Sequence, residues 1–503
     1  MSEIQLDSPV PLYFQLKQIL VEKIRRGELR PGDRIMTEAE LCREYGISRT
    51  PVRQALTEMV REGYLTRTAG RGTFVTESSA LKNQDGKNSL RVVFSDARWQ
   101  ELLESAVQFY NSAQPEKPLH LNIDIVHLWD IHDHLVSLVG NGTAPDISVL
   151  DSVWLAEFAN QSHLVPVEEA DPQWCEFLKL DTFPAMLEAN RFQGQLWGIP
   201  ICGDASVLWY RRDWLEAEKL SPPSTWEELV EVARHFQRPE VKERYGLGDY
   251  PFVFVGSRRG GETTTYQLLP FIWAAGGQLL DEGHILLASP QTASALTFLR
   301  SLIHEQRLAP PDVVDYTWDH SAQVFARGKA ALALGGTYES FFIRETAGWD
   351  EAEFLERVGF VPVPAGPDGE PSTLVGGMNY VLYRQSASLQ QSLGLLRMTV
   401  DPQILKPFCE RTGQIPGRIS VANALQREGK SFVSQTIPLI ERARTRPSLP
   451  GFARVSRQFA ALVEDCLSGR RPVEQALALT AERISAITDL PIAESEVFSR
   501  PDA

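Results

Sequence analysis

Cysteine is scarce in this chain of 503 residues, with only five scattered along its length. No pair has the C-x-x-C spacing of a metal or redox site, so we expect no disulfide framework. No stretch approaches about 18 continuous apolar residues, which argues against a membrane span. The first residues lack the basic and apolar segments of a signal peptide. We therefore expect a cytoplasmic protein with no membrane partner.

The composition is that of a soluble globular protein, with 43% hydrophobic and 23% charged residues. The net charge of −15 is unevenly distributed. Residues 1–76 hold 12 Lys and Arg against 10 Asp and Glu, whereas the remainder holds 38 against 55. A small, weakly basic head thus precedes a large acidic body. Such asymmetry hints at contact between the head and nucleic acid.

The head has the periodicity of three short helices. Apolar residues from Leu12 to Ile24 recur at spacings of three and four, which predicts an amphipathic helix. Thr37 and Glu40 form a capping box that begins a second helix, and Gly46 ends it. A third helix is expected over 49–56. Two helices joined by a short turn containing Gly are typical of a helix-turn-helix. Two strands, 64–67 and 73–75, then predict a β-hairpin wing.

The third predicted helix carries residues suited to reading DNA. A recognition helix enters the major groove by its amino-terminal end, where Arg49 and Arg53 share one face. An arginine donates two hydrogen bonds to guanine or grips phosphate in the same geometry. Thr50 is placed to contact a base edge or the backbone. Gly72 lets the wing approach DNA closely, while Arg71 meets phosphate or the minor groove.

The whole order of motifs over residues 9–76 closely resembles the GntR family of bacterial transcription regulators. The motifs are Pro11-Leu12-Tyr13, Pro31-Gly32-Asp33, Glu38-x-Glu40-Leu41, Ser48-Arg49-x-x-Val52-Arg53-x-Ala55-Leu56 and Gly70-x-Gly72-Thr73-Phe74-Val75. This resemblance implies a winged helix-turn-helix over 1–76, double-stranded operator DNA as partner, and a homodimer. The candidate DNA-binding residues are Thr37, Glu38, Arg49, Thr50, Arg53, Arg71 and Gly72.

Residues 77–89 are polar and without periodicity, which indicates a linker. In the body that follows, predicted strands over 90–94, 119–126 and 145–150 alternate with helices over 98–110 and 131–139. This alternation predicts an α/β domain with a largely parallel sheet. Ligands bind beyond the carboxyl ends of such strands, where Trp99, Asp151 and Trp154 are expected.

Residues 90–490 resemble the extracellular solute-binding proteins of ABC importers, particularly the sugar-binding group. The motifs that carry this resemblance include Gly194-Gln195-Leu196-Trp197-Gly198-Ile199-Pro200, Pro223-Ser224-Thr225-Trp226, Trp273-Ala274-Ala275-Gly276-Gly277, Phe325-Ala326-Arg327-Gly328-Lys329-Ala330-Ala331, Gly376-Gly377-Met378 and Thr412-Gly413-Gln414-Ile415-Pro416. The resemblance implies a two-lobed effector domain over 90–503 that closes on its ligand by a hinge. The expected lobes are about 90–200 with 340–400, and 201–339 with 401–500.

A carbohydrate presents apolar C–H faces to aromatic rings and hydroxyl groups to carboxylates, amides and arginines. Eleven tryptophans suit that requirement. We therefore expect a mono- or oligosaccharide effector. The candidate ligand-binding residues are Trp99, Asp151, Trp154, Asp204, Trp209, Trp273, Tyr338, Met378, Asn379 and Arg411.

Two other functional classes compete with this expectation. GntR heads also occur fused to aminotransferase-like domains, but no lysine stands in the setting that pyridoxal phosphate requires. The segment 256–261 lacks the Gly-Lys-Ser/Thr of a P-loop. His127, His132 and His134 lack zinc-site spacing. The other alternative is a sugar-binding protein that has lost DNA binding, against which Arg49 and Arg53 argue. We expect no enzyme activity, no cofactor and no metal.

Overall fold

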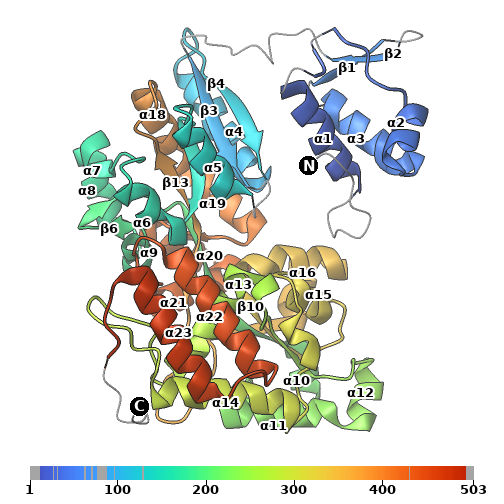
Figure 1. The fold of residues 1–503 in the computed structure, drawn as a ribbon, viewed down its shortest axis with the longest axis vertical. Coiled ribbons are helices and arrows are strands. Elements are labelled where there is room, and N and C mark those ends of the chain that lie inside the picture. The colour runs from blue at the N-terminus through green and yellow to red at the C-terminus, as the bar shows by residue number, and fades with distance from the viewer. Residues whose placement is uncertain are drawn as a thin grey trace. The chain divides into compact units, whose positions relative to one another are not determined.

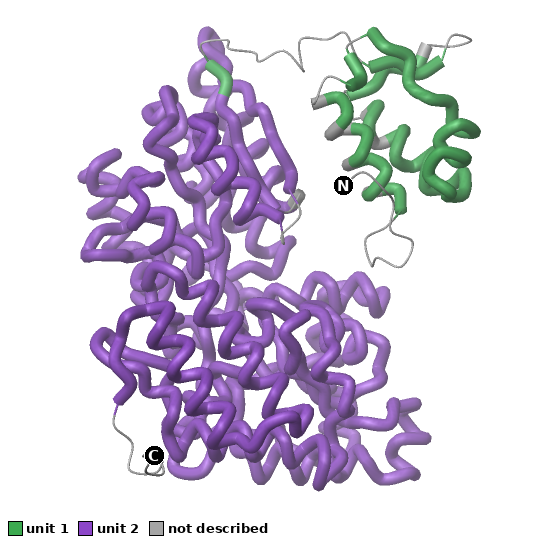
Figure 2. Tube along the Cα trace, viewed as in Figure 1, with its two compact units in different colours: residues 1–89 green, residues 90–503 purple. Residues whose placement is uncertain are grey.

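The computed structural model describes residues 12–25, 28–30, 32–61, 64–68, 72–75, 88–95, 97–126, 130–429 and 431–493. The chain forms two compact units, residues 1–89 and residues 90–503 (Figure 1, Figure 2). Most of the expected linker, up to residue 87, lies outside the described residues. Within the described ranges, no helix has both the length and the apolar character needed to cross a membrane.

The first unit contains three helices and a β-hairpin, as the sequence predicts. The elements are α1 (Leu12–Arg25), α2 (Glu38–Tyr45), α3 (Arg49–Arg61), β1 (Leu65–Thr68) and β2 (Gly72–Val75). The capping box of α2 is confirmed, because Thr37 accepts a hydrogen bond from the Glu40 backbone and the Glu40 carboxylate accepts one from the Thr37 backbone. α3 ends at Arg61, five residues beyond its predicted end. The hydrophobic core of the first unit buries Leu16, Leu20, Leu41, Val52, Leu56, Met59 and Val75.

The described residues of the second unit contain two larger sheets and a two-stranded hairpin, and the first larger sheet has strand order β13-β5-β3-β4. Its strands are β3 (Ser89–Phe94), β4 (His120–Ile125), β5 (Ile147–Asp151) and β13 (Met378–Leu382). β3 and β5 are parallel, whereas β13 is antiparallel to β5. Helices α4 (Ala97–Ala113), α5 (Ile131–Gly140) and α6 (Ser152–Asn160) alternate with these strands, close to the predicted ranges. We call this sheet and its helices the first lobe.

The second sheet is built around the long strand β8 (Cys202–Arg211) in the order β11-β8-β10-β9. Its other strands are β9 (Phe252–Val253), β10 (Leu332–Gly336), β11 (Val358–Val361), β12 (Val375–Gly376) and β14 (Ile415–Pro416). β8 pairs antiparallel with β10, β11, β12 and β14, whereas β9 pairs parallel with β10. The predicted largely parallel sheet is therefore wrong for this half, which we call the second lobe.

The expected division of the lobes also differs from the structure in one segment. The expected first lobe includes 340–400. However, β11 lies in the second sheet, because its backbone forms antiparallel hydrogen bonds with β8. The chain returns to the first sheet only after Gly376, where β13 begins.

Helices cover both sheets of the second unit. In the second lobe, α13 (Glu262–Ala274) packs against β8 and β10, and α22 (Phe452–Leu467) packs against α13, α14 (Pro290–His304) and α6. α22 thus touches elements of both lobes, and α23 (Val473–Thr488) lies beside it (Figure 1). The remaining helices are α7 (Val167–Ala170), α8 (Pro172–Leu180), α9 (Pro184–Ala189), α10 (Arg212–Ala217), α11 (Trp226–Gln237), α12 (Pro239–Tyr245), α15 (His320–Ala326), α16 (Ser340–Ala347), α17 (Glu351–Arg357), α18 (Leu389–Thr399), α19 (Pro402–Thr412), α20 (Ile419–Glu428) and α21 (Phe432–Glu441), with 3₁₀ turns η1 (Arg258–Gly260), η2 (Pro311–Val314) and η3 (Thr337–Glu339) and a hairpin of β6 (Arg191–Phe192) and β7 (Gln195–Leu196).

Three backbone segments connect the lobes side by side. The segment before β8 bridges Ile199 to Tyr380 of β13, β12 runs directly into β13, and β14 pairs with Gly203. Gly377 lies between β12 and β13 with φ +147°, and a Cβ there would stand 2.8 Å from the carbonyl oxygen of Cys202. A side chain at this position would therefore force the connecting segments apart.

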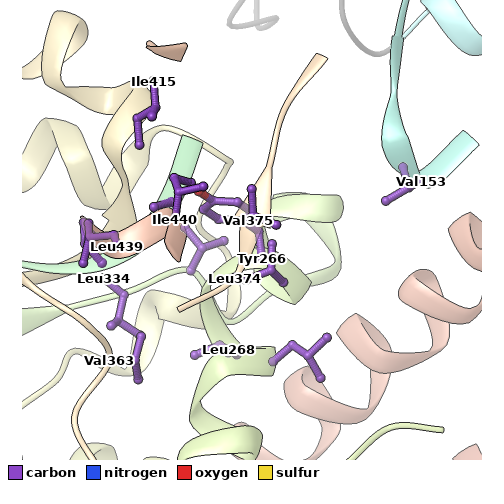
Figure 3. Packing of buried hydrophobic residues seen from close by; sticks show 14 of the residues in the cluster. Val153, Tyr266, Leu268, Leu334, Val363, Leu374, Val375, Ile415, Leu439 and Ile440 are labelled. Atoms are coloured by element: carbon purple, nitrogen blue, oxygen red, sulfur yellow. The ribbon is translucent and has the colours of Figure 1, made fainter. Parts of the chain in front are cut away.

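The hydrophobic core of the second unit supports these connections. Figure 3 shows Leu374 and Val375 packing with side chains of distant segments, including Tyr266 of α13 and Ile440 of α21. All four side chains are at most 5% exposed. The connecting segments are consequently held at their second-lobe ends, and the cavity described next lies beside them.

Candidate ligand cavity and DNA-binding face

A cavity of about 350 Å³ lies between the two lobes of the second unit. This volume is near the lower end of the range for small-molecule sites. Its wall combines first-lobe residues, second-lobe residues and the connecting segments. The lining residues are Ser95, Arg98, Trp99, Asp151, Trp154, Asp204, Glu262, Thr263, Tyr266, Trp318, Tyr338, Phe342, Gly376, Gly377, Met378, Gln414 and Arg446.

Aromatic rings line the cavity from both lobes. Trp99 of α4 and Trp154 of α6 belong to the first lobe. In the second lobe, the rings of Tyr266 and Tyr338 meet edge to face with centroids 5.8 Å apart. Trp318 and Phe342 form a similar pair at 5.7 Å. Such an arrangement offers apolar faces on two sides of a bound molecule.

Arg446, in the loop between α21 and α22, contacts carboxylates of both lobes. Its Nη1 donates to Glu262 at 2.6 Å, and its Nη2 donates to Asp151 at 3.3 Å and to the Ser152 hydroxyl at 3.1 Å. Asp151 ends β5 of the first sheet, whereas Glu262 begins α13 of the second lobe. The Arg446 side chain is only 5% exposed. A buried guanidinium therefore joins the lobes at the cavity.

Asp204 supplies a third carboxylate. It lies in β8 opposite Gly376, and it accepts a 2.6 Å hydrogen bond from the Tyr266 hydroxyl. Burial raises the pKa of Asp204 to about 6, because a charged carboxylate is poorly solvated there. The pKa of Glu262 is raised as well, since burial outweighs the opposing effect of Arg446. The cavity wall thus has a concentration of acidic groups.

The first unit presents an arginine-bearing surface on α3. Arg49, Thr50 and Arg53 are exposed and line one shallow groove. Glu38 lies beside them, 3.3 Å from Arg53 and 3.8 Å from Arg67 of β1. The carboxylate of Glu38 thereby orients one guanidinium on the helix and one on the hairpin. This surface presents N–H donors that can hydrogen-bond to phosphate oxygens and to the acceptor atoms of guanine.

Comparison with known protein families decides the nature of the larger unit. The model for bacterial extracellular solute-binding proteins matches residues 131–392, which is just over half of the chain. The chain belongs to the bacterial extracellular solute-binding protein family. Residues 12–75 match the model for bacterial regulatory proteins of the gntR family. The first unit of this solute-binding family member is therefore a GntR domain.

Individual relatives agree with both assignments. A maltose-bound MalE3 structure from T. maritima superposes with a TM-score of 0.68 at 24% identity, covering 79% of this chain and 99% of that one, and so shares the fold. A "Probable ABC transporter-binding protein" of Deinococcus radiodurans is 29% identical over 51% of this chain and 59% of its own length. The HTH-type transcriptional repressor NagR of Bacillus subtilis is 46% identical over 86 residues, which are 17% of this chain and 35% of NagR.

Six of the ten candidate ligand residues line the cavity of the solute-binding domain. They are Trp99, Asp151, Trp154, Asp204, Tyr338 and Met378. Asp151 ends β5, at the carboxyl end where it is expected, whereas Asp204 lies near the start of β8 and does not follow a strand. The fold nevertheless brings these two carboxylates of different lobes to one cavity. Whether these side chains bind a ligand stays a prediction.

The other four candidates lie elsewhere in the solute-binding domain. Trp209 is fully buried and donates its Nε1 to the buried carboxylate of Glu339 at 3.0 Å. Trp273 is buried in α13 beneath the Arg444 guanidinium. Asn379 is buried in β13 and accepts a hydrogen bond from Asn190. Arg411 is exposed and pairs with Glu101 at 2.6 Å. Core packing or surface pairing thus occupies these side chains.

Sequence reasoning missed several cavity residues, and these come mainly from loops and helix starts. They are Arg98, Glu262, Thr263, Tyr266, Trp318, Phe342, Gln414 and Arg446. Glu262 and Thr263 directly follow the glycines of the 256–261 segment, which forms η1 and leads into α13. That glycine cluster was the available signal. Arg446 lies in a loop outside any helix or strand pattern, so only the tertiary fold brings it to the cavity.

The candidate residues of the GntR domain have different local roles. Thr37 caps α2, while Glu38 orients Arg53. Gly72 has φ +124°, and a Cβ there would lie 2.8 Å from Nε of Arg34, so glycine allows Arg34 to lie beside the hairpin. Arg71 lies outside the described residues. Arg34 and Arg67 are additional cations close to this surface.

No metal site is found among the described residues, where no group of three His, Cys, Asp or Glu side chains is suitably placed. His132 and His134 instead face Glu157 and Asp124, and His127 lies outside the described residues. The five cysteines are free. The match of residues 131–392 to a solute-binding family also speaks against the aminotransferase-like alternative.

Proposed function

We propose that this chain is a DNA-binding transcription regulator whose operator affinity is controlled by a small solute bound between the lobes. One observation carries the proposal: a GntR domain and a solute-binding domain with an interlobe cavity occur in a single chain. The GntR domain supplies Arg49, Thr50, Arg53 and Gly72 for contact with duplex DNA, together with Thr37, Glu38 and Arg71. The protein acts where chromosomal DNA is, in the cytoplasm.

The effector is a carbohydrate in this proposal. Aromatic rings on both sides of the cavity suit the C–H faces of a sugar, and the acidic groups suit its hydroxyls. The maltose-bound structure, which shares the fold, supports the same class. Trp99, Trp154 and Tyr338 provide apolar contacts, and Asp151 and Asp204 accept hydroxyl hydrogens.

Regulation follows from lobe closure. A bound sugar contacts both lobes and favours the closed arrangement. In a homodimer, closure changes the spacing of the two GntR domains relative to half-sites about one helical turn or a multiple apart. The coupling required is typically about 1–3 kcal/mol. Both families are binding families, which supports a function without catalysis.

The test uses the full-length chain. Operator fragments are selected from genomic DNA, and binding is measured by fluorescence anisotropy with and without each sugar of a panel. A sugar present at 100 times its dissociation constant raises the free energy of unfolding by about 2.7 kcal/mol, which a thermal shift detects. The proposal is wrong if the chain ignores duplex DNA at low salt, or binds it equally with and without every sugar that stabilises it.

A further inference from the structure

Strand β4 is the last strand of the first sheet, and within the described residues no strand pairs with its outer edge (Figure 1). Its inner edge meets β3, where the Val126 backbone donates to the Phe94 carbonyl at 2.8 Å. Phe94 is the last residue of β3 and Val126 directly follows β4, so the two strands run in the same direction. An outer edge of this kind presents a row of N–H and C=O groups that a further strand can bind.

Backbone alternation identifies the groups on the outer edge. In an extended strand, the N–H and C=O of one residue point to one side and those of the next residue to the other. Because Val126 faces β3, Leu121, Ile123 and Ile125 face away from it. Just before the strand, the Asn111 side chain closes this edge, since it accepts from the Leu119 N–H at 2.7 Å and donates to the Leu119 carbonyl at 3.0 Å. The open part of the edge therefore runs from Leu121 to Ile125.

The side chains of β4 offer little protection against strand addition. Leu121 and Ile123 are partly buried against the core, and Ile125 is 40% exposed. β4 contains no lysine, arginine or proline, the residues that commonly protect edge strands. The carboxylate of Asp124, its one acidic group, is held by His134 of α5 at 3.1 Å. The edge is therefore apolar on one face and open to pairing.

We propose that β4 pairs antiparallel with β4 of a second copy of this chain, across a two-fold axis at Ile123, so that the two first-lobe sheets join. This inference deepens the proposed function, on which it rests, because it names the surface by which the homodimer forms. Leu121 of each copy then pairs with Ile125 of the other, and Ile123 pairs with its own counterpart, so every outward N–H and C=O finds a partner. An axis at Asn122 would instead set Ile125 opposite Leu119, whose backbone groups are already bound.

The side chains agree with this register. On one face of the joined sheet, Leu121, Ile123 and Ile125 of both copies form a continuous apolar row, which favours pairing. On the other face, Asn122 stands opposite Asp124 of the other copy, so an amide donor meets a carboxylate and no like charges oppose each other. The outer edge of β4 is therefore complementary to itself.

The same axis suits two GntR domains on one operator. The chain enters the sheet at Ser89, the first residue of β3, directly after the linker. Strand spacings of about 4.8 Å and a rise of about 3.3 Å per residue place the two Ser89 positions roughly 25 Å apart across the axis. Adjacent half-sites of an operator lie about 34 Å apart. The two linkers therefore start at a separation compatible with neighbouring half-sites.

Disulfide trapping on the full-length chain tests both the surface and the register. At the axis, Ile123 lies opposite itself with Cα atoms about 5.5 Å apart, a separation that a disulfide spans. Ile123→Cys, oxidised with copper phenanthroline, should therefore run mostly as a covalent dimer on a non-reducing gel and revert with dithiothreitol. Leu180→Cys is the matched control, because Leu180 is 83% exposed but lies on α8, and this variant should stay a single chain. No covalent dimer from Ile123→Cys, or equal amounts from both variants, overturns the inference.

Sedimentation equilibrium tests the energetics of the joint without a cross-link. Ile125→Lys places a charge opposite Leu121 at two symmetric points of the dimer, so the dissociation constant of the dimer should rise at least about tenfold. Leu180→Lys is the matched control and should leave self-association unchanged. Circular dichroism shows that both variants fold. Unchanged self-association of a folded Ile125→Lys chain, or a wild-type chain that stays monomeric at micromolar concentration, contradicts the β4 joint.

The two proposals fail differently. A chain that forms the Ile123→Cys cross-link but ignores duplex DNA disproves the regulator function and supports the β4 joint. A chain that binds operator DNA as a dimer without this cross-link retains the regulator function, and the β4 joint is then wrong. The latter result is expected if the GntR domains alone pair, or if an extended peptide of another protein occupies the edge.

Discussion

Glu38 is the residue that links the helix and the hairpin of the GntR domain. It pairs with Arg53 of α3 and approaches Arg67 of β1. The Arg53 side chain is 67% exposed, so the pair holds the guanidinium in place at little cost in accessibility. Exposed pairs of this kind contribute little to folding stability. We therefore expect these pairs to orient hydrogen-bond donors for a partner.

Arg53→Ala should weaken operator binding by about 1–3 kcal/mol if Arg53 donates to a guanine. Fluorescence anisotropy with the operator and with an unrelated duplex measures the change. Loss on the operator alone indicates base reading, whereas equal loss on both indicates a phosphate contact. Unchanged affinity for both would remove Arg53 from the interface.

Asp204 gives the solute-binding domain a pH dependence of known sign. Its pKa is about 6 in the folded chain against an ordinary value of 3.8, so the folded state holds the proton more tightly. The contribution of this group to stability is present below about pH 4 and is lost as pH rises to about 6. Asp204→Asn cannot ionise and still accepts from Tyr266. Its Tm should exceed that of the wild type at pH 7, and the difference should shrink towards pH 4. Parallel Tm curves between pH 4 and 8 would contradict this assignment.

At the scale of elements, the crossing of β12 into β13 is the most constrained segment. Gly377 combines a positive φ with close approach to the carbonyl of Cys202. Gly377→Ala should lower the free energy of unfolding by about 1–3 kcal/mol, since strain and a backbone contact add. Urea denaturation measures the loss. Gly142→Ala is the control, because Gly142 also has positive φ, +70°, but nothing within 4 Å of its would-be Cβ. Equal losses in both variants would show that φ alone matters.

Local signals in the sequence predict the individual helices and strands well, whereas the pairing of distant strands cannot be read from them. The capping box of α2, the hairpin and the first alternating strands follow from nearby residues, because caps and periodicity are local properties. The antiparallel partners of β8 come from four distant segments, which no local pattern specifies. Trp209 stands in that strand, and its burial follows from packing against Phe354, Phe360 and Phe432.

The same distinction applies to the cavity. Asp151 is predicted because polar residues beyond the carboxyl ends of parallel strands gather at a sheet edge, but that rule does not account for Asp204, which lies near the start of β8. Arg446 approaches them only because its loop runs beside Thr373 and Val375, with backbone hydrogen bonds of 2.9 Å to both. Such a contact depends on two chain segments about 70 positions apart. A single sequence carries no signal for it.

For the whole molecule, the proposed function requires that DNA and solute affect each other equally. If a sugar changes operator affinity by some factor, the operator must change sugar affinity by the same factor, because both measure one coupling free energy. We expect a factor of about 5 to 150. Calorimetry of the sugar with free and operator-bound chain gives one value, and anisotropy with and without sugar gives the other. Arg53→Ala is the control, since it should retain sugar affinity while the operator, at concentrations that saturate the wild type, loses its effect. Unequal factors, or a factor of one in both directions, would mean that the cavity and the GntR domain work independently.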